Sequence, residues 1–362
     1  MAGPGWGWRR RPSDVDTRVT GPLRTALHYI LAGDLSSAEV ALAEAAKIDS
    51  SSADIYLALA NLYRARGEIG RAIQIHQNLL LRHDLPDEFR REALLGLALD
   101  FRTGGFLRRA AASFEELLES EPKHATALRE LERIRIESGD WEKAIRVRRR
   151  IGPGDPRSAQ ILAHLYTGLG RSAVKAGSEA DARKSFRRAL QYDRTCAEAY
   201  LELGDQQLRE GKPRKAVGIW QRVLPLHPEI GLVTYARLWE GFQASSEIGS
   251  FEILLRQRLD AAPQDHEAAI WLARTLVYER KVDEALSLLR HRLDQAPDFL
   301  PAAAEVGRIL LREKRDSDAI KVFEELLDRL PLERKRLTCA NCGTQDTALH
   351  WRCPQCGEWD SF

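Results

Sequence analysis

A repeated spacing of glycine and alanine runs through most of the chain. Six times a glycine is followed five residues later by an alanine, at Gly33/Ala38, Gly67/Ala72, Gly105/Ala110, Gly139/Ala144, Gly177/Ala182 and Gly211/Ala216. Successive glycines are 34 or 38 residues apart. Farther along, Ala285 and Ala319 are again 34 residues apart, and Phe251 takes the matching position before them. A fixed period of this length indicates one small structural unit repeated along the chain.

The period and the residues around it are those of the tetratricopeptide repeat, a pair of antiparallel helices. Glycine lets the chain leave the first helix through a left-handed turn, and alanine lets the two helices approach closely. We count nine units between about Val19 and Leu332, which predicts an all-α, right-handed solenoid of roughly eighteen helices. Stacked repeats of this kind offer a concave surface that normally holds a peptide or another protein.

Two of the intervals between glycines are 38 residues long instead of 34. The extra residues fall near "RHDLPDEF" (82–89) and "GPGDPRSA" (152–159). Because insertions in loops cost little free energy, both segments are predicted to be longer turns between repeats.

Composition excludes several classes of protein. The hydrophobic fraction of 44% indicates a folded chain, and the net charge of +2 gives no general electrostatic reason to expect a nucleic-acid partner. No stretch approaches the apolar length needed to span a membrane, and the N-terminus lacks the apolar core of a signal peptide. A cytoplasmic protein is therefore expected.

The repeats carry no catalytic signature. The nine histidines are scattered, and neither a nucleophile motif nor a phosphate-binding loop is present. His76 stands where these repeats usually have an aromatic residue, which favours a packed structural histidine. Cys196 is solitary and is expected to be a small apolar filler. The sequence therefore predicts a protein that is not an enzyme.

The last 25 residues hold four of the five cysteines, Cys339, Cys342, Cys353 and Cys356. They form two Cys-x-x-Cys-Gly pairs, in which Gly343 and Gly357 allow the backbone to curl so that amides face the sulfurs. Four thiolates make a closed tetrahedral site for one zinc or one iron ion, which indicates a structural metal, although an iron ion could also carry an electron. Trp351 and Trp359 flank the second pair and are expected to pack the segment against itself or against the last repeats.

With the repeats and the cysteine pairs considered together, the chain resembles the lipopolysaccharide assembly protein B family of Gram-negative bacteria. The likeness is greatest in "LALANLYRARGEIGRAIQIHQNLLLRHDLPDEFRREALLGLALDF", "GDWEKAI" and "LHWRCPQCGEWD". The resemblance implies a solenoid at 19–332 and a rubredoxin-like metal-binding domain at 333–362, whose ligands would be Cys339, Cys342, Cys353 and Cys356. Iron is the metal implied by the family.

The resemblance also implies a function. Members of the family are adaptors at the cytoplasmic face of the inner membrane. They promote proteolysis of the lipid A-committing deacetylase LpxC by the membrane protease FtsH, and they coordinate lipopolysaccharide assembly proteins. The expected partners are therefore these proteins, with no nucleic acid and no small-molecule substrate. Two alternatives stay open: a rubredoxin-like electron-transfer protein whose repeats dock a redox partner, and a general scaffold with an unrelated client.

The N-terminus departs from the family pattern. Typical members begin with one transmembrane helix, whereas residues 1–18 here read as a flexible basic leader. Trp6, Trp8 and Arg9–Arg11 are similar to the inner flank of such a helix, where aromatic residues precede positive charge. Either this is a variant without the anchor, or the recorded start lies downstream of the true one.

Overall fold

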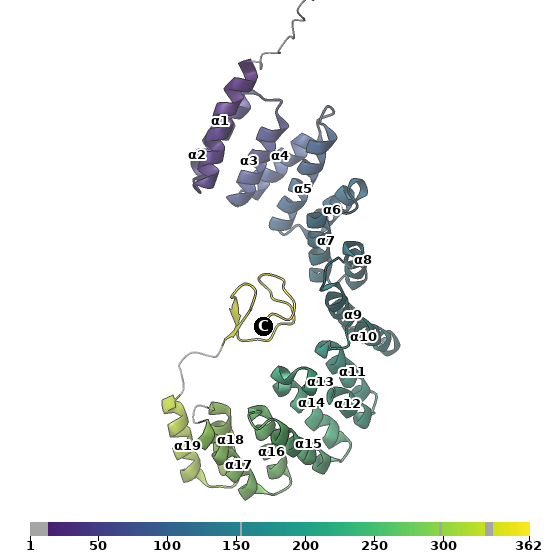
Figure 1. The fold of residues 1–362 in the computed structure, drawn as a ribbon, viewed down its shortest axis with the longest axis vertical. Coiled ribbons are helices and arrows are strands. Elements are labelled where there is room, and N and C mark those ends of the chain that lie inside the picture. The colour runs from purple at the N-terminus through teal and green to yellow at the C-terminus, as the bar shows by residue number, and fades with distance from the viewer. Residues whose placement is uncertain (1–13, 153, 297–298, 330–335) are drawn as a thin grey trace, which may run out of the picture. The chain divides into compact units, whose positions relative to one another are not determined.

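The computed structural model describes residues 14–152, 154–296, 299–329 and 336–362. The chain forms two compact units, residues 1–155 and residues 156–362. Each unit has its own stack of helices, which Figure 1 labels in chain order.

In the described part of the first unit, eight helices pair into four antiparallel hairpins. They are α1 (Asp14–Leu31), α2 (Leu35–Ile48), α3 (Ala53–Ala65), α4 (Ile69–Leu80), α5 (Asp87–Thr103), α6 (Leu107–Ser120), α7 (Ala125–Glu137) and α8 (Trp141–Ile151).

The described part of the second unit holds five more hairpins and a small C-terminal domain. The helices are α9 (Ser158–Lys175), α10 (Glu179–Tyr192), α11 (Ala197–Arg209), α12 (Pro213–Trp220), α13 (Val223–Leu226), the 3₁₀ turn η1 (Pro228–Ile230), α14 (Gly231–Ala244), α15 (Ile248–Ala261), α16 (His266–Tyr278), α17 (Val282–Gln295), α18 (Leu300–Arg312) and α19 (Asp316–Arg329). The predicted all-α fold with about nine repeats and a C-terminal four-cysteine domain is confirmed.

The residues that define the repeat do what their chemistry predicts. Every alanine of the series is fully buried where the two helices of a hairpin cross, and Phe251 is fully buried in its equivalent position. The six glycines that precede these alanines all have positive φ, between 69° and 80°. These values are the left-handed turns expected after the first helix of each hairpin.

The extra residues of the two 38-residue intervals lie only in part in the turns between repeats. The first helices α5 and α9 span 17 and 18 residues, whereas α3, α7 and α11 each span 13. Much of each insertion therefore extends a first helix at its N-terminal end. This corrects the prediction of simple loops, and in α9 the extra turn makes contacts described below.

The C-terminal domain is a ribbon of short strands and turns. Strand β1 (Leu337–Thr338) pairs antiparallel with β2 (Gln345–Asp346), and an isolated bridge joins Arg352 to Trp359. The predicted domain boundary at 332/333 lies outside the described residues, as do residues 1–13 of the predicted leader. Helix α1 begins at Asp14, within the segment predicted as leader.

In the ranges that the structure describes, no helix combines the length and the apolar character needed to cross a membrane.

Candidate metal centre

Two turns of the same design bring the four cysteines together. In the first turn the amide of Gly343 donates to the carbonyl of Cys339 at 2.9 Å, and in the second the amide of Gly357 donates to the carbonyl of Cys353 at 2.9 Å. Both glycines have positive φ, 74° and 71°. The two turns have the same backbone geometry, and each directs its two cysteine sulfurs toward a common centre.

The spacing of the sulfurs fits one tetrahedral metal ion. The Sγ atoms of Cys339 and Cys356 are 3.8 Å apart, those of Cys342 and Cys353 are 3.7 Å apart, and all four lie within 4.8 Å of one another. A tetrahedron with metal–sulfur bonds of about 2.3 Å has edges of about 3.8 Å. The cluster can therefore hold a metal ion without rearrangement of its backbone.

Polar groups next to the sulfurs favour thiolates. The backbone amide of Cys356 donates to the Cys353 sulfur at 3.5 Å, and the side-chain amide of Asn341 donates to the Cys356 sulfur at 3.5 Å. A hydrogen bond with the Ser361 hydroxyl lowers the pKa of the Cys339 thiol to about 6. Donors of this kind disperse the negative charge that four thiolates bring to one ion.

Burial raises the pKa of the Cys353 thiol to about 11. Without an ion, this thiol therefore holds its proton at neutral pH, and a metal must displace that proton to bind. Metal affinity at such a cluster depends on pH for this reason. A tetrahedral ion held by all four sulfurs would have no coordination position left for water or a substrate.

The ribbon contacts the fifth repeat through a stacked pair of rings. The indole of Trp359 lies on the imidazole of His164 in α9, with ring centroids 4.6 Å apart and an interplanar angle of 11°. Trp351, the second tryptophan singled out in the sequence, packs against the apolar core of the second unit. The structure thus places Trp359 on the fifth repeat rather than on the last repeats.

Asp360 adds polar contacts beside this ring pair. Its Oδ2 atom is 2.8 Å from Nε2 of His164 and accepts a hydrogen bond of 2.8 Å from the side-chain amide of Gln160. Arg157 forms an ion pair with Glu358. Gln160 lies in the extra turn of α9 and Arg157 immediately precedes it, so the inserted residues help to build the contact with the ribbon.

His164 is held as a cation between two carboxylates. Its Nδ1 atom is 2.7 Å from Glu198 in α11, and Arg171 pairs with the same carboxylate. Burial alone would lower the pKa of His164, but the hydrogen bonds with Asp360 and Glu198 outweigh it and raise the pKa to about 9. At neutral pH the imidazolium therefore links the ribbon to two helices of the solenoid.

Cys196 lies next to this group but is not bound into it. Its sulfur is within 4.8 Å of ligand atoms of His164 and Glu198, so the three side chains are close enough together to contact one ion. Both ring nitrogens of His164 already have partners, and burial raises the pKa of Cys196 to about 12. A protonated, buried thiol fits the small apolar filler predicted from the sequence.

Comparisons with known proteins identify both parts of the chain. Two family models described as "Tetratricopeptide repeat" match the chain. One matches residues 29–91, and the other matches residues 95–156, 167–229 and 272–333. The family described as "Rubredoxin metal binding domain" matches residues 338–362.

Among curated proteins, "Lipopolysaccharide assembly protein B" of Haemophilus influenzae is 27% identical over 377 residues, which cover 99% of this chain and 94% of that protein. The protein of the same name from Escherichia coli K12 is 24% identical over 387 residues, with the same coverage. A solved tetratricopeptide repeat protein from Parabacteroides merdae is 16% identical, with a TM-score of 0.37 over 72% of this chain and 99% of that one. The resemblance to the lipopolysaccharide assembly protein B family is confirmed by the two curated relatives.

Proposed function

Because the chain belongs to the tetratricopeptide-repeat family, we propose that it is a non-enzymatic adaptor that serves lipopolysaccharide assembly by binding other proteins. The observation that carries this proposal is the similarity to lipopolysaccharide assembly protein B along 99% of the chain, repeats and cysteine ribbon included. Repeat surfaces of this type bind peptides and proteins, which is the chemistry that an adaptor needs.

The finer proposal concerns the partners and the place of action. In this proposal the chain delivers the deacetylase LpxC to the membrane protease FtsH and coordinates lipopolysaccharide assembly proteins. It acts at the cytoplasmic face of the bacterial inner membrane. The support is the family resemblance.

In this proposal one iron or zinc ion stabilises the ribbon, and its four ligands are Cys339, Cys342, Cys353 and Cys356. Gly343 and Gly357 shape the two turns, while Trp351 and Trp359 pack the ribbon. The sulfur spacing and the closed coordination support a structural role for the ion. A ribbon of this size has too small a core to fold on its own apolar contacts, so the ion would supply the missing stability.

Turnover of the deacetylase in the native host tests the proposed function. Depletion of the chain should lengthen the half-life of LpxC, and re-expression of the wild-type chain should restore it. The Cys353→Ser variant should fail to restore it, whereas Cys196→Ala, which removes the cysteine outside the ribbon, should succeed. An unchanged half-life of LpxC on depletion would exclude this role and leave a scaffold with another client.

The identity of the metal separates the adaptor from the electron-transfer alternative. Elemental analysis and a visible spectrum of the purified chain should show zinc, or an iron centre that does not cycle between oxidation states in the presence of cellular reductants. An iron centre that cycles rapidly and reversibly would favour electron transfer.

A further inference from the structure

A recess with aromatic and arginine side chains lies on the first helices of the last three repeats. It has a volume of about 590 Å³ and is formed by neighbouring helices α14, α16 and α18. Its lining includes Trp239, Trp271, Tyr278, Arg274, Arg308 and Arg312, and we call it the aromatic–arginine pocket. The first helices are the surface on which tetratricopeptide solenoids bind partners.

The aromatic side chains form one connected wall. The rings of Trp239 and Tyr278 meet edge to face with centroids 5.3 Å apart, and those of Trp239 and Trp271 are 6.2 Å apart. The guanidinium of Arg274 lies over the Trp271 ring, 4.9 Å from its centroid. Tyr278 is 54% exposed, so the wall faces solvent although its base is packed.

The charges around this wall do not cancel. Glu305 is buried and is shared by Arg274 at 2.9 Å and Arg308 at 3.0 Å. Arg280 and Arg312 also line the pocket, are exposed, and have no ion-pair partner within the described residues. Glu313 is the other acidic residue of the lining, so four arginines face two carboxylates.

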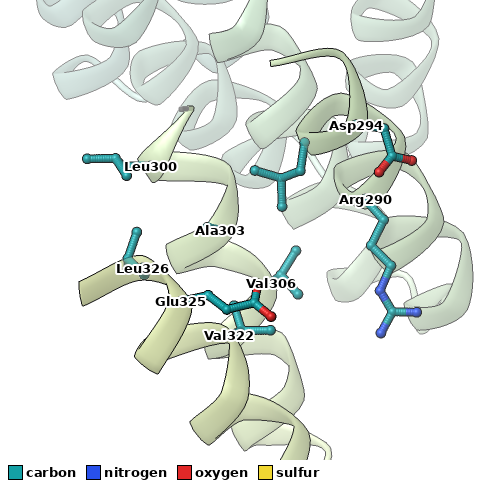
Figure 2. A pocket seen from close by; sticks show the side chains of 9 residues that line it. Arg290, Asp294, Leu300, Ala303, Val306, Val322, Glu325 and Leu326 are labelled. Carbon is teal, nitrogen blue, oxygen red and sulfur yellow. The ribbon is translucent and has the colours of Figure 1, made fainter. Parts of the chain in front are cut away.

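A second recess of the same volume shows what distinguishes this one. Figure 2 shows it between α17, α18 and α19, with Leu300, Val306, Val322 and Leu326 among its lining side chains. Its charged residues are one arginine and two carboxylates, and they provide no positive excess. Among the described residues, nothing indicates what would cover that recess.

We propose that the aromatic–arginine pocket binds an acidic peptide segment of a client protein, with an apolar or aromatic side chain inserted against Trp239, Trp271 and Tyr278. This inference rests on the proposed adaptor function and names the chemistry of the client. Tryptophan, tyrosine and arginine are the residues that contribute most to binding at protein interfaces. Exposed arginines pair with carboxylates in a directional way, which favours aspartate and glutamate beside the anchoring side chain.

An anionic membrane surface is the competing source of negative charge. It would engage the exposed arginines, but charged headgroups would leave the aromatic wall without an apolar partner. The aromatic wall therefore favours a peptide with an apolar or aromatic side chain.

Selection from a peptide library tests the proposal. The full-length chain is immobilised and exposed to peptides randomised over Asp, Glu, Lys, Arg, Leu, Phe and Ser. Peptides in which acidic residues flank Leu or Phe should be enriched, and their affinity, measured by fluorescence anisotropy, should fall as salt rises. The double variant Arg280→Glu/Arg312→Glu and the single variant Tyr278→Ala should each weaken the enriched peptides about tenfold.

The matched control is Arg146→Glu/Arg187→Glu, which makes the same charge change at exposed arginines on α8 and α10. This control should bind the enriched peptides as the wild type does. Equal enrichment of basic peptides, or equal affinity in the pocket variants and the control, would overturn the proposal. So would binding to phosphatidylglycerol vesicles that requires Arg280 and Arg312 when no peptide is enriched.

Rescue of LpxC turnover separates this inference from the proposed function. If the wild-type chain restores turnover in depleted cells and the pocket variants bind peptides normally, only the pocket assignment is wrong. If the wild-type chain does not restore turnover, the proposed function is wrong, while peptide selection still reports on the pocket.

Discussion

In each hairpin one residue of the first helix faces one residue of the second helix, and the chemistry of this buried pair differs between repeats. In the fifth, sixth and ninth repeats a glycine faces a large aromatic ring sixteen residues later, as in Gly204 and Trp220. A Cβ atom on Gly204 would come within 2.1 Å of that ring. In the fourth repeat the same two positions hold Glu132 and Arg148, both buried, with Nε of Arg148 donating to Oε1 of Glu132 at 2.6 Å. A charged pair replaces the glycine and the ring.

We expect Glu132→Ala to lower the free energy of unfolding of the first unit by about 3 kcal/mol, because it removes the buried partner of Arg148 and leaves only the more exposed Asp155, 2.6 Å from Nη1 of Arg148. The double variant Glu132→Gly/Arg148→Phe restores the arrangement of the other repeats and should recover most of that loss. Urea unfolding followed by circular dichroism measures both effects. A double variant less stable than Glu132→Ala would show that the fourth repeat cannot accept the aromatic arrangement.

The turn after the first helix keeps its geometry where glycine is missing. In the last three repeats the residues in this position are Ser246, Arg280 and Lys314, with φ of 59°, 67° and 61°. A side chain in this conformation costs about 1–2 kcal/mol. The packing of each hairpin therefore imposes the turn on these residues.

Lys314→Gly should stabilise the ninth repeat by about 0.5–1 kcal/mol, since removal of the Cβ strain outweighs the added freedom of the unfolded chain. The reciprocal change Gly211→Lys, at φ of 70°, should destabilise the sixth repeat by a similar amount. Thermal unfolding of both variants checks the pair. Shifts of the same sign in the two variants would contradict this account.

The sequence predicts the residues that each hairpin needs by itself, but not the partners that those residues find in the next repeat. The 34-residue period locates the alanines and the turns, because both are local requirements of one hairpin. His76 is fully buried, which confirms the prediction of a packed structural histidine. Its partner Asp100, 2.6 Å away from Nδ1, belongs to the next repeat. Partners of this kind depend on packing between hairpins, which a periodic pattern does not specify.

The contact between the ribbon and α9 was the part of the site that sequence reasoning missed. His164 bonds to Glu198 and Asp360, which are 34 and 196 residues away along the chain. Among nine scattered histidines nothing marks this one. The one sequence feature that points to this contact is the 38-residue interval between Gly139 and Gly177. Its extra residues include Gln160, which contacts Asp360. The four cysteines, in contrast, lie within eighteen residues of one another, and their spacing alone predicts that they share one metal ion.

The raised pKa of His164 predicts that stability falls in alkaline solution. A group whose pKa is raised on folding contributes fully below its unfolded value of about 6.5, and the contribution is lost as the pH rises through about 9. A shift of this size corresponds to about 3 kcal/mol. The melting temperature of the second unit should therefore fall over this range. The fall should be much smaller in His164→Gln and reduced in part in Asp360→Asn, where Glu198 still pairs with the imidazolium.

His83→Gln is the matched control, because His83 is exposed in the turn between α4 and α5. Its melting temperature should follow the wild type at every pH. An alkaline fall that is the same in His164→Gln and in the wild type would mean that the imidazolium does not hold the ribbon.

At the scale of the whole chain, the contacts of the ribbon assign it to the second unit. The described hairpins form two compact units, and the ribbon belongs to the second, where it contacts α9 through Trp359 and Asp360. In the proposed function the ion held by the four cysteines is a structural component, so its loss is expected to release the ribbon and expose the surface of α9.

Hydrogen exchange of the full chain with and without metal tests most directly whether the ion holds the ribbon on the fifth repeat. Removal of the metal with a chelator, or the Cys353→Ser variant, should speed amide exchange in residues 336–362 and in the first turns of α9. Exchange in α3 to α7 should not change. Faster exchange in the ribbon with no change in α9, or no change in either segment, would contradict the account.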